Sequence, residues 1–400
     1  MTWNRTICII VIFLSFMLRV SAQHMDEIKK QYPREHAVVL ANKLHYNISI
    51  AEGQPHIESE ETEQIAFLTQ DAHKYMSSYG FYHSDFQQLV AFEAFTRTAS
   101  DKKLKVTEFK TKSSKEDFVF YDDSKETTFN FPNVEEGAIG NLHVSRVDHN
   151  PYLISPFYFG RGIPVMDAEL SITVPKDMKI QYRLLGMDSS QIAVHIENNR
   201  KTNEYTFSYK NCAAIRKYDD APGSAWFAAH VIFFIDSYKD DNGNTVHLLS
   251  NLDDLYKLSY GYLKNINTSI TNDMQKLVDS ITAKSTDPEL NARKIYSWVQ
   301  QHIKYVAFEE GMEGFVPRDA KVVCNRRFGD CKDMASILTE MMQAAKVPAW
   351  FTWIGSRDLP YAFTSLPLPM VSNHMICTIK LKDQYIFLDA TDPTCIFGFP

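Results

Sequence analysis

The residue with the clearest chemical potential is Cys331, which lies in the run Gly329–Asp333 at the start of a predicted helix. From Met334 onward apolar residues recur at helical spacing. Asp330 is a good N-cap, and it would place Cys331 in the first turn. Backbone N–H groups and the positive end of the helix dipole favour a thiolate there, and the thiolate is the nucleophilic form of cysteine. The residues that fall away from this apolar face are Lys332, Thr339, Glu340 and Gln343.

Two carboxylates flank this cysteine, and both oppose a negative charge on sulfur. They belong to Asp330 and Asp333. Like charges at this range disfavour ionisation of the thiol. We therefore expect a positive partner to complete the site.

The candidate partners are His374 and Asp389, which follow on two predicted strands. Residues 371–381 and 385–390 are rich in β-branched and apolar side chains and flank the turn residues Lys382 and Asp383, so a hairpin is predicted. A two-residue loop pairs Leu381 with Gln384 and places Asp389 diagonally across from His374 on one face. A three-residue loop would put them on opposite faces.

Together these three side chains suit attack on an amide. A thiolate attacks the carbonyl, an imidazolium protonates the leaving amine, and a carboxylate orients the imidazole. Taken singly, each has a plainer interpretation: Cys331 as a buried small residue, His374 as a structural histidine and Asp389 as the start of a turn. Their combination favours a catalytic triad over a domain kept only for binding.

Three sequence blocks carry a resemblance to the transglutaminase-like superfamily. The blocks are Gly329–Asp333, Ser372–His374 and Phe387–Pro393, and the likeness covers Pro288 to Pro400. It implies a papain-like α+β core in which a nucleophile helix packs on an antiparallel sheet. By the same resemblance Cys331 would be the nucleophile, His374 the general acid/base and Asp389 its orienting residue. The oxyanion would be bound by the N–H of Cys331 and one upstream donor, for which Asn325 is the candidate.

The preceding region is predicted to be β-rich. Apolar and polar residues alternate at 169–174 and 178–184, which predicts one hairpin, and again at 192–196 and 205–209, which predicts a second. Such short strands favour a sandwich-like domain. The region also resembles the β-rich domain of unknown function found before transglutaminase-like domains in secreted bacterial proteins. The likeness rests on Phe131–Gly137 and the strand from Pro164 to Pro175.

The chain therefore divides into four expected parts. Residues 1–22 form a signal peptide, 23–236 the β-rich domain, 237–286 a helical connector and 287–400 the catalytic domain, opened by a helix with Asp287 as N-cap. Proteins of this architecture commonly continue beyond the position that corresponds to Pro400. One expectation is therefore that this chain is shortened at its C-terminus, and the other is that the domain closes early.

The N-terminus predicts export. An apolar run, Ile7 to Leu18, ends in Val20-Ser21-Ala22, the small-residue pattern of a signal-peptidase site, and we expect cleavage after Ala22. The run is short for a membrane anchor, and Arg19 weighs against one, so no stable membrane insertion is expected after cleavage. The predicted location is periplasmic or secreted, in a bacterial cell envelope.

Composition, charge and motifs limit which molecules the protein is expected to bind. The chain has 400 residues and is 44% hydrophobic, enough for two cored domains. Loss of Arg5 and Arg19 with the leader changes the formal net charge from −7 to −9, so nucleic acid is not expected as a partner. No CxxC or HExxH motif occurs, and neither a metal nor another cofactor is expected.

Five cysteines would remain after cleavage, an odd number that leaves at least one free thiol. Cys331 is the expected free thiol. Cys377 and Cys395 are poor disulfide partners, because the predicted hairpin places Cys377 opposite Leu388.

The expected function is hydrolysis of peptide or isopeptide amides through a thioacyl-enzyme, on a protein or peptide substrate such as a cell-envelope peptide. Attack by an amine in place of water would make the protein a true transglutaminase, and a non-catalytic envelope binding protein is the third class. The proline-rich loop 356–370 precedes His374, where it could form either a substrate rim or a surface crossover.

Overall fold

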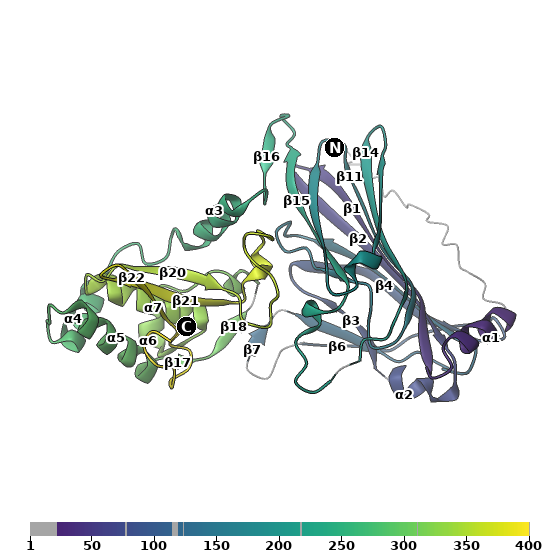
Figure 1. Ribbon diagram of the computed structural model, residues 1–400, viewed down its shortest axis with the longest axis horizontal. Helices are drawn as coiled ribbons and strands as arrows, with labels where there is room; N and C mark the ends of the chain where they lie inside the picture. Colours follow the sequence, from purple (N-terminus) through teal and green to yellow (C-terminus); the bar gives the residue numbers. More distant parts are fainter. Residues whose placement is uncertain are drawn as a thin grey trace, which may run out of the picture.

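The computed structural model describes residues 22–399 apart from 77, 114–118, 123, 217 and 310. Residues 1–21 of the predicted signal peptide lie outside the described residues. The described chain forms two lobes, a large β-rich lobe and a smaller lobe of helices and one sheet (Figure 1). In the part of the chain that is described, no helix has the length and apolar character needed to cross a membrane.

The β-rich lobe is built on one long twisted sheet of eight strands in the order β13-β14-β11-β1-β2-β9-β4-β5. Its strands form because side chains alternate between buried and accessible positions, as along β11. Strands β1 and β11 are parallel, and the other neighbours are antiparallel. The strand bounds are β1 (Ala37–Ala51), β2 (Gln54–Phe67), β4 (Gln87–Arg97), β5 (Lys103–Lys105), β9 (Ile139–Asp148), β11 (Val165–Pro175), β13 (Ala193–Asn198) and β14 (Thr202–Cys212).

Two smaller sheets contribute to the core of this lobe. Apolar residues of the long sheet, such as Ile57 and Leu170, belong to one buried cluster with Phe233 of β15 and Phe129 of β8. Helix α1 (Ala22–Gln31) packs in a separate cluster with β1 and β2. The layered, β-rich architecture is as predicted.

The remaining elements of this lobe lie in two smaller sheets and two short segments. The second sheet comprises β10 (Phe157–Tyr158), β12 (Lys179–Leu185), β15 (His230–Lys239) and β16 (Thr245–His247), and the third comprises β3 (Tyr79–His83), β6 (Phe109–Ser113) and β8 (Lys125–Phe129). The two short segments are β7 (Val119–Asp122) and the helix α2 (His73–Met76).

One predicted hairpin is correct and the other is wrong. Strands β13 and β14 pair as expected, with Ile196 opposite Tyr205. Strands β11 and β12 instead belong to different sheets, because β12 pairs with β15. Alternating hydrophobicity indicates a strand with one buried face, but it does not identify the neighbouring strand.

The predicted helical connector begins with strand. β15 runs to Lys239 and β16 pairs with it, and helices α3 (Leu252–Leu263) and α4 (Asn272–Thr282) follow. Both helices begin at capping residues, since the side chains of Asn251 and Thr271 accept hydrogen bonds from the first turn of α3 and α4 respectively.

The smaller lobe surrounds one central helix. Helix α5 (Pro288–His302) begins at its predicted N-cap, Asp287. Helix α7 (Cys331–Ala344) packs against α4, α5, α6 (Ala320–Arg326) and the sheet β20-β21-β22, which comprises β20 (Ala349–Ile354), β21 (His374–Leu381) and β22 (Gln384–Leu388). The short strands β17 (Lys304–Tyr305) and β19 (Phe328–Gly329) pair with each other, and β18 (Ala307–Glu309) follows β17.

Most of the residues that fall away from the apolar face of α7 are nevertheless buried. Lys332, Thr339 and Glu340 are each 3% exposed, and of these residues Gln343 alone is exposed. Elements on every side of α7 bury its polar residues together with its apolar ones. Helical periodicity predicted which apolar residues of α7 face the core, but it did not predict that the polar residues would be buried as well.

Candidate active site

The start of α7 has the predicted capping geometry. The carboxylate of Asp330 accepts a hydrogen bond of 3.0 Å from the backbone N–H of Asp333, and the backbone N–H of Asp330 donates to the Asp333 carboxylate at 3.3 Å. A Cβ atom at Gly329 would lie 2.4 Å from that of Asp333. The reciprocal cap therefore requires glycine at this position, and it holds Cys331 as the first residue of the helix.

Each carboxylate beside the cysteine has its own cation. Lys332 Nζ lies 2.8 Å from Asp330 Oδ2, and both side chains are almost fully buried. Arg318 Nη1 lies 2.6 Å from Asp333 Oδ2. These pairs compensate the two negative charges that would otherwise oppose a thiolate at Cys331.

The hairpin that carries the other two candidates has the predicted register. Leu381 pairs with Gln384 and Cys377 with Leu388, so Lys382 and Asp383 form a two-residue loop. Lys382 has a φ of 56°, in the left-handed region that such turns use. This register places His374 Nε2 2.8 Å from Asp389 Oδ2, and the predicted contact is present.

Asp389 is held by a local turn and by α5. Its Oδ1 accepts hydrogen bonds from the N–H and the hydroxyl of Thr391, at 3.0 and 2.7 Å. The Tyr296 hydroxyl donates to its backbone carbonyl at 2.7 Å. Burial favours the neutral acid, but the hydrogen bonds from His374 and Thr391 outweigh it and hold the pKa of Asp389 below its usual value.

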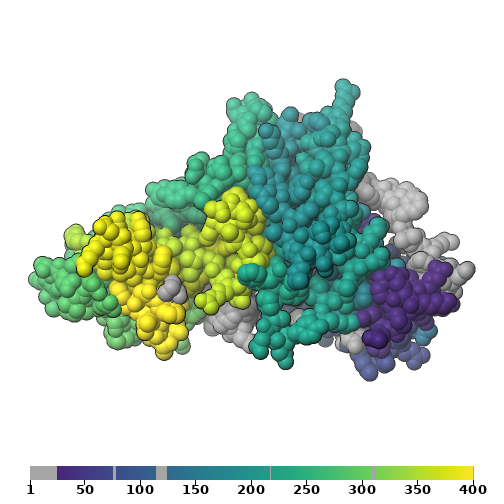
Figure 2. All heavy atoms as spheres, viewed as in Figure 1, coloured from purple at the N-terminus to yellow at the C-terminus, as the bar shows by residue number. Residues whose placement is uncertain are grey.

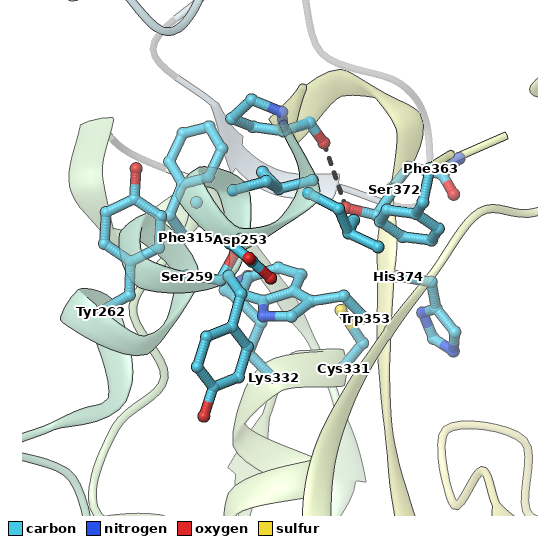
Figure 3. A pocket seen from close by; sticks show the side chains of 16 residues that line it. Asp253, Ser259, Tyr262, Phe315, Cys331, Lys332, Trp353, Phe363, Ser372 and His374 are labelled. Atoms are coloured by element: carbon cyan, nitrogen blue, oxygen red, sulfur yellow. Dashed lines mark hydrogen bonds between the residues drawn. The ribbon is translucent and has the colours of Figure 1, made fainter. Parts of the chain in front are cut away.

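His374 lies between this carboxylate and the cysteine sulfur. Burial lowers the pKa of the imidazole, but its hydrogen bonds to Asp389 and to the Cys331 side chain raise that pKa to about 10. The imidazole is therefore protonated at neutral pH, and it supplies the positive partner that the sequence required. Figure 3 shows Cys331 and His374 reaching one pocket, from α7 and from the start of β21.

This pocket has a volume of about 510 Å³, and its wall comes from distant parts of the chain. Cys331 and His374 share it with Trp353 of β20, Tyr256 of α3 and Phe363 of the loop before His374. Cys331 is 7% exposed, so the pocket is its route to a substrate. The arrangement suits nucleophilic attack on a carbonyl group that enters this space.

Two family models match the sequence. Residues 275–389 match the transglutaminase-like superfamily, and residues 56–216 match a domain of unknown function, DUF3857. The chain carries a transglutaminase-like domain. Both predicted resemblances are confirmed.

Of two solved structures that match this chain, the first shares its fold. A protein from Parabacteroides distasonis, provisionally described as a protease, is 16% identical with a TM-score of 0.68, and the match covers 89% of this chain and 68% of that one. A protein from Cytophaga hutchinsonii, provisionally described as a cysteine protease, is 11% identical with a TM-score of 0.25, over 84% of this chain and 75% of that one. No curated protein matches the sequence.

The amide donor predicted at position 325 is not part of this site. Asn325 is exposed on α6 and does not line the pocket of the transglutaminase-like domain. Trp353 is a pocket residue that the sequence did not reveal. Its indole Nε1 is buried, has no hydrogen-bond partner among the described residues, and lies on a residue that lines the pocket. A buried N–H without a partner is costly, so this group is an unusual feature of the pocket wall.

The β-rich lobe supports both sides of the pocket. Strand β7 of that lobe pairs with β18 of the transglutaminase-like domain, and Phe86 contacts the pocket residue Phe315, with ring centroids 6.2 Å apart. On the other side, Phe363 and Pro369 line the pocket within residues 355–371, which we call the strap.

The strap is anchored on the second sheet of the β-rich lobe, against which it lies in Figure 2. Its Leu366, Leu368 and Val371 share a buried cluster with β15, and the Tyr361 hydroxyl lies 3.0 Å from His230 Nε2. The predicted loop is therefore a pocket rim and an interlobe contact at once. Proline content indicated stiffness, but it did not indicate this partner.

The remaining cysteines do not form disulfides. Cys212, Cys324, Cys377 and Cys395 are free thiols, as is Cys331. Across the described ranges, no group of His, Cys, Asp or Glu side chains has the arrangement of a metal site.

Asp389→Asn is expected to destabilise the domain by about 2 kcal/mol at pH 6 and by much less at pH 10.5. The raised pKa of His374 means that stabilisation of its imidazolium is complete below the unfolded value of 6.5 and is lost as pH rises through about 10. Denaturant unfolding at both pH values measures this difference. Asp383→Asn, at the exposed turn of the same hairpin, is the control. An equal loss at both pH values would contradict the pairing with a charged imidazole.

Proposed function

We propose that this protein is an exported cysteine-dependent hydrolase that cleaves peptide or isopeptide amides through a thioacyl-enzyme intermediate. The observation that carries the proposal is the position of His374, which bonds Asp389 on one side and the Cys331 side chain on the other. A charged imidazole beside a cysteine at a helix N-terminus is the arrangement that activates sulfur as a nucleophile.

The reaction follows from these three side chains. The Cys331 thiolate attacks the amide carbonyl carbon, and a C–S bond forms as the carbonyl π electrons move to oxygen. As the oxygen returns its electrons, the C–N bond breaks and the His374 imidazolium donates its proton to the departing nitrogen. Neutral His374 then takes a proton from water, whose oxygen attacks the thioester. The carboxylic acid leaves and the thiolate and imidazolium are restored.

The transient oxyanion needs donors that the ground state does not use. The backbone N–H of Cys331 lies in the first turn of α7, where helical N–H groups have no acceptor within the helix. The indole N–H of Trp353 is the second donor in the proposal, in place of Asn325. Such preorganised donors are commonly worth about 10²-fold or more in rate.

Hydrolysis is the proposed fate of the thioacyl-enzyme because water needs no dedicated acceptor site, whereas transfer requires a preference for an amine. Export rests on the predicted leader, and it places the substrate among peptides of the cell envelope or its surroundings. Transglutaminase activity and a binding role without catalysis remain the competing classes.

Incubation with a peptide library in ¹⁸O-labelled water tests the reaction class. We expect new carboxyl ends that carry one ¹⁸O atom, detected by mass spectrometry, and their loss by at least about 10³-fold in Cys331→Ala. Cys395→Ala, at a cysteine of intermediate exposure outside the pocket, is the matched control. Release of ammonia with incorporation of an added primary amine would instead identify a transglutaminase. Cleavage that persists in Cys331→Ala would exclude the proposed mechanism.

A further inference from the structure

Aromatic side chains form part of the wall of the pocket beside Cys331. Tyr262 of α3 lines it together with Phe315, Trp353 and Phe363 from three other segments (Figure 3), and Tyr256 of α3 lines it as well. Phe315 and Tyr262 are in ring contact, with centroids 5.8 Å apart. Aromatic faces carry partial negative charge and attract cations as well as apolar groups.

The charged residues that line this pocket differ in whether they have an ion-pair partner. The cations Lys332 and His374 each have a carboxylate partner, Asp330 and Asp389 respectively, at 2.8 Å. Asp253 also lines the pocket, and its carboxylate has no ion-pair partner among the described residues. Among the described residues that line the pocket, the charge left without an ion-pair partner is therefore the negative charge of Asp253.

The position of Asp253 makes this charge accessible. Asp253 lies in the first turn of α3, and its own backbone N–H is satisfied by the Asn251 side chain. The residue is exposed, and its carboxylate points into the space between the aromatic side chains (Figure 3). An incoming cation would displace water from this carboxylate without breaking an existing ion pair.

We propose that the pocket selects substrates that carry a cationic group, an ammonium or a guanidinium, close to the scissile amide. Asp253 is the specificity-determining residue, and the surrounding aromatic faces provide cation–π contacts. An anionic group would face Asp253 with no free cation among the described lining residues. The inference rests on the proposed function, because it assigns a substrate class to the same site.

Methanethiosulfonates of three charges test this selectivity without a known substrate. Cys331 sulfur attacks the sulfenyl sulfur of the reagent, a disulfide forms, and methanesulfinate leaves with the bonding electrons. The 2-aminoethyl reagent is cationic, the 2-sulfonatoethyl reagent is anionic and the methyl reagent is neutral. The measured quantity is the rate of Cys331 modification by each reagent in the full chain, followed by mass spectrometry of the peptide that contains Cys331.

The ratio of cationic to anionic rates is expected to fall roughly tenfold in Asp253→Asn, because one unit charge at the pocket is removed. Asp253→Lys should lower the ratio further. Asp273→Asn, a 91% exposed side chain on α4 outside the pocket, removes the same charge and should leave the ratio unchanged. Equal ratios in Asp253→Asn and Asp273→Asn would overturn the cation proposal alone. Failure of the neutral reagent to modify Cys331 would overturn the proposed function.

Discussion

Iodoacetamide is expected to alkylate Cys331 at pH 7 faster than any other described cysteine, and His374→Ala should slow this reaction about tenfold or more, because it removes the positive partner of the sulfur. Without the imidazolium the sulfur loses the positive group that lies beside it and favours attack as a nucleophile. Peptide mapping after timed alkylation measures both rates.

The other cysteines provide an internal scale for this measurement. Burial raises the pKa of Cys212 and of Cys377 to about 12, and it raises the pKa of Cys324 above its usual value. These thiols should react slowly in wild type and in the variant alike. His302→Ala, which removes an exposed imidazole from the end of α5, is the control for loss of a histidine. Equal labelling of all five cysteines would refute an activated nucleophile.

The second large effect concerns stability. Lys332→Met is expected to reduce the free energy of unfolding by about 3–5 kcal/mol, because it leaves Asp330 buried without its cation. Both side chains are nearly inaccessible, at 3% and 1% exposure. Burial already raises the pKa of Asp330, and Lys332 is the main opposing influence. Denaturant unfolding at pH 7 measures the loss.

A double variant separates the lost charge pair from lost packing. Lys332→Met combined with Asp330→Asn removes both charges and keeps an N-cap side chain, so most of the stability should return. Lys321→Met, at an exposed lysine of α6, should change stability by no more than about 0.5 kcal/mol. A double variant as unstable as Lys332→Met would show that the buried charge of Asp330 is not the cause.

The β-rich lobe contacts the pocket of the candidate site on two sides. It reaches one side of the pocket through β7 and Phe86, and the other through the strap on β15. The pocket walls therefore depend on contacts between lobes, while Cys331, His374 and Asp389 are held within the smaller lobe. Substrate binding should thus be more sensitive to the interlobe contacts than the reactivity of Cys331 is.

Local patterns in the sequence singled out Cys331, His374 and Asp389 as candidates, with the length of the hairpin loop left open. A helix cap and a two-residue turn are each set by residues within a few positions, so the N-cap at Asp330 and the pairing of Leu381 with Gln384 could be read without knowledge of the fold. Because the turn sets the register, it also set the distance between His374 and Asp389.

The features that the tertiary structure alone decided depend on contacts distant in sequence. The enclosure of Lys332 comes from elements packed around α7, and the separation of β12 from β11 comes from pairing with β15 some fifty residues later. The pocket is likewise assembled from separate segments, which is why Asp253 and Trp353 were not predicted and the candidate donor Asn325 does not line it. Periodicity shows which side chains are to be buried, whereas the identity of the groups that bury them emerges only when the chain is folded.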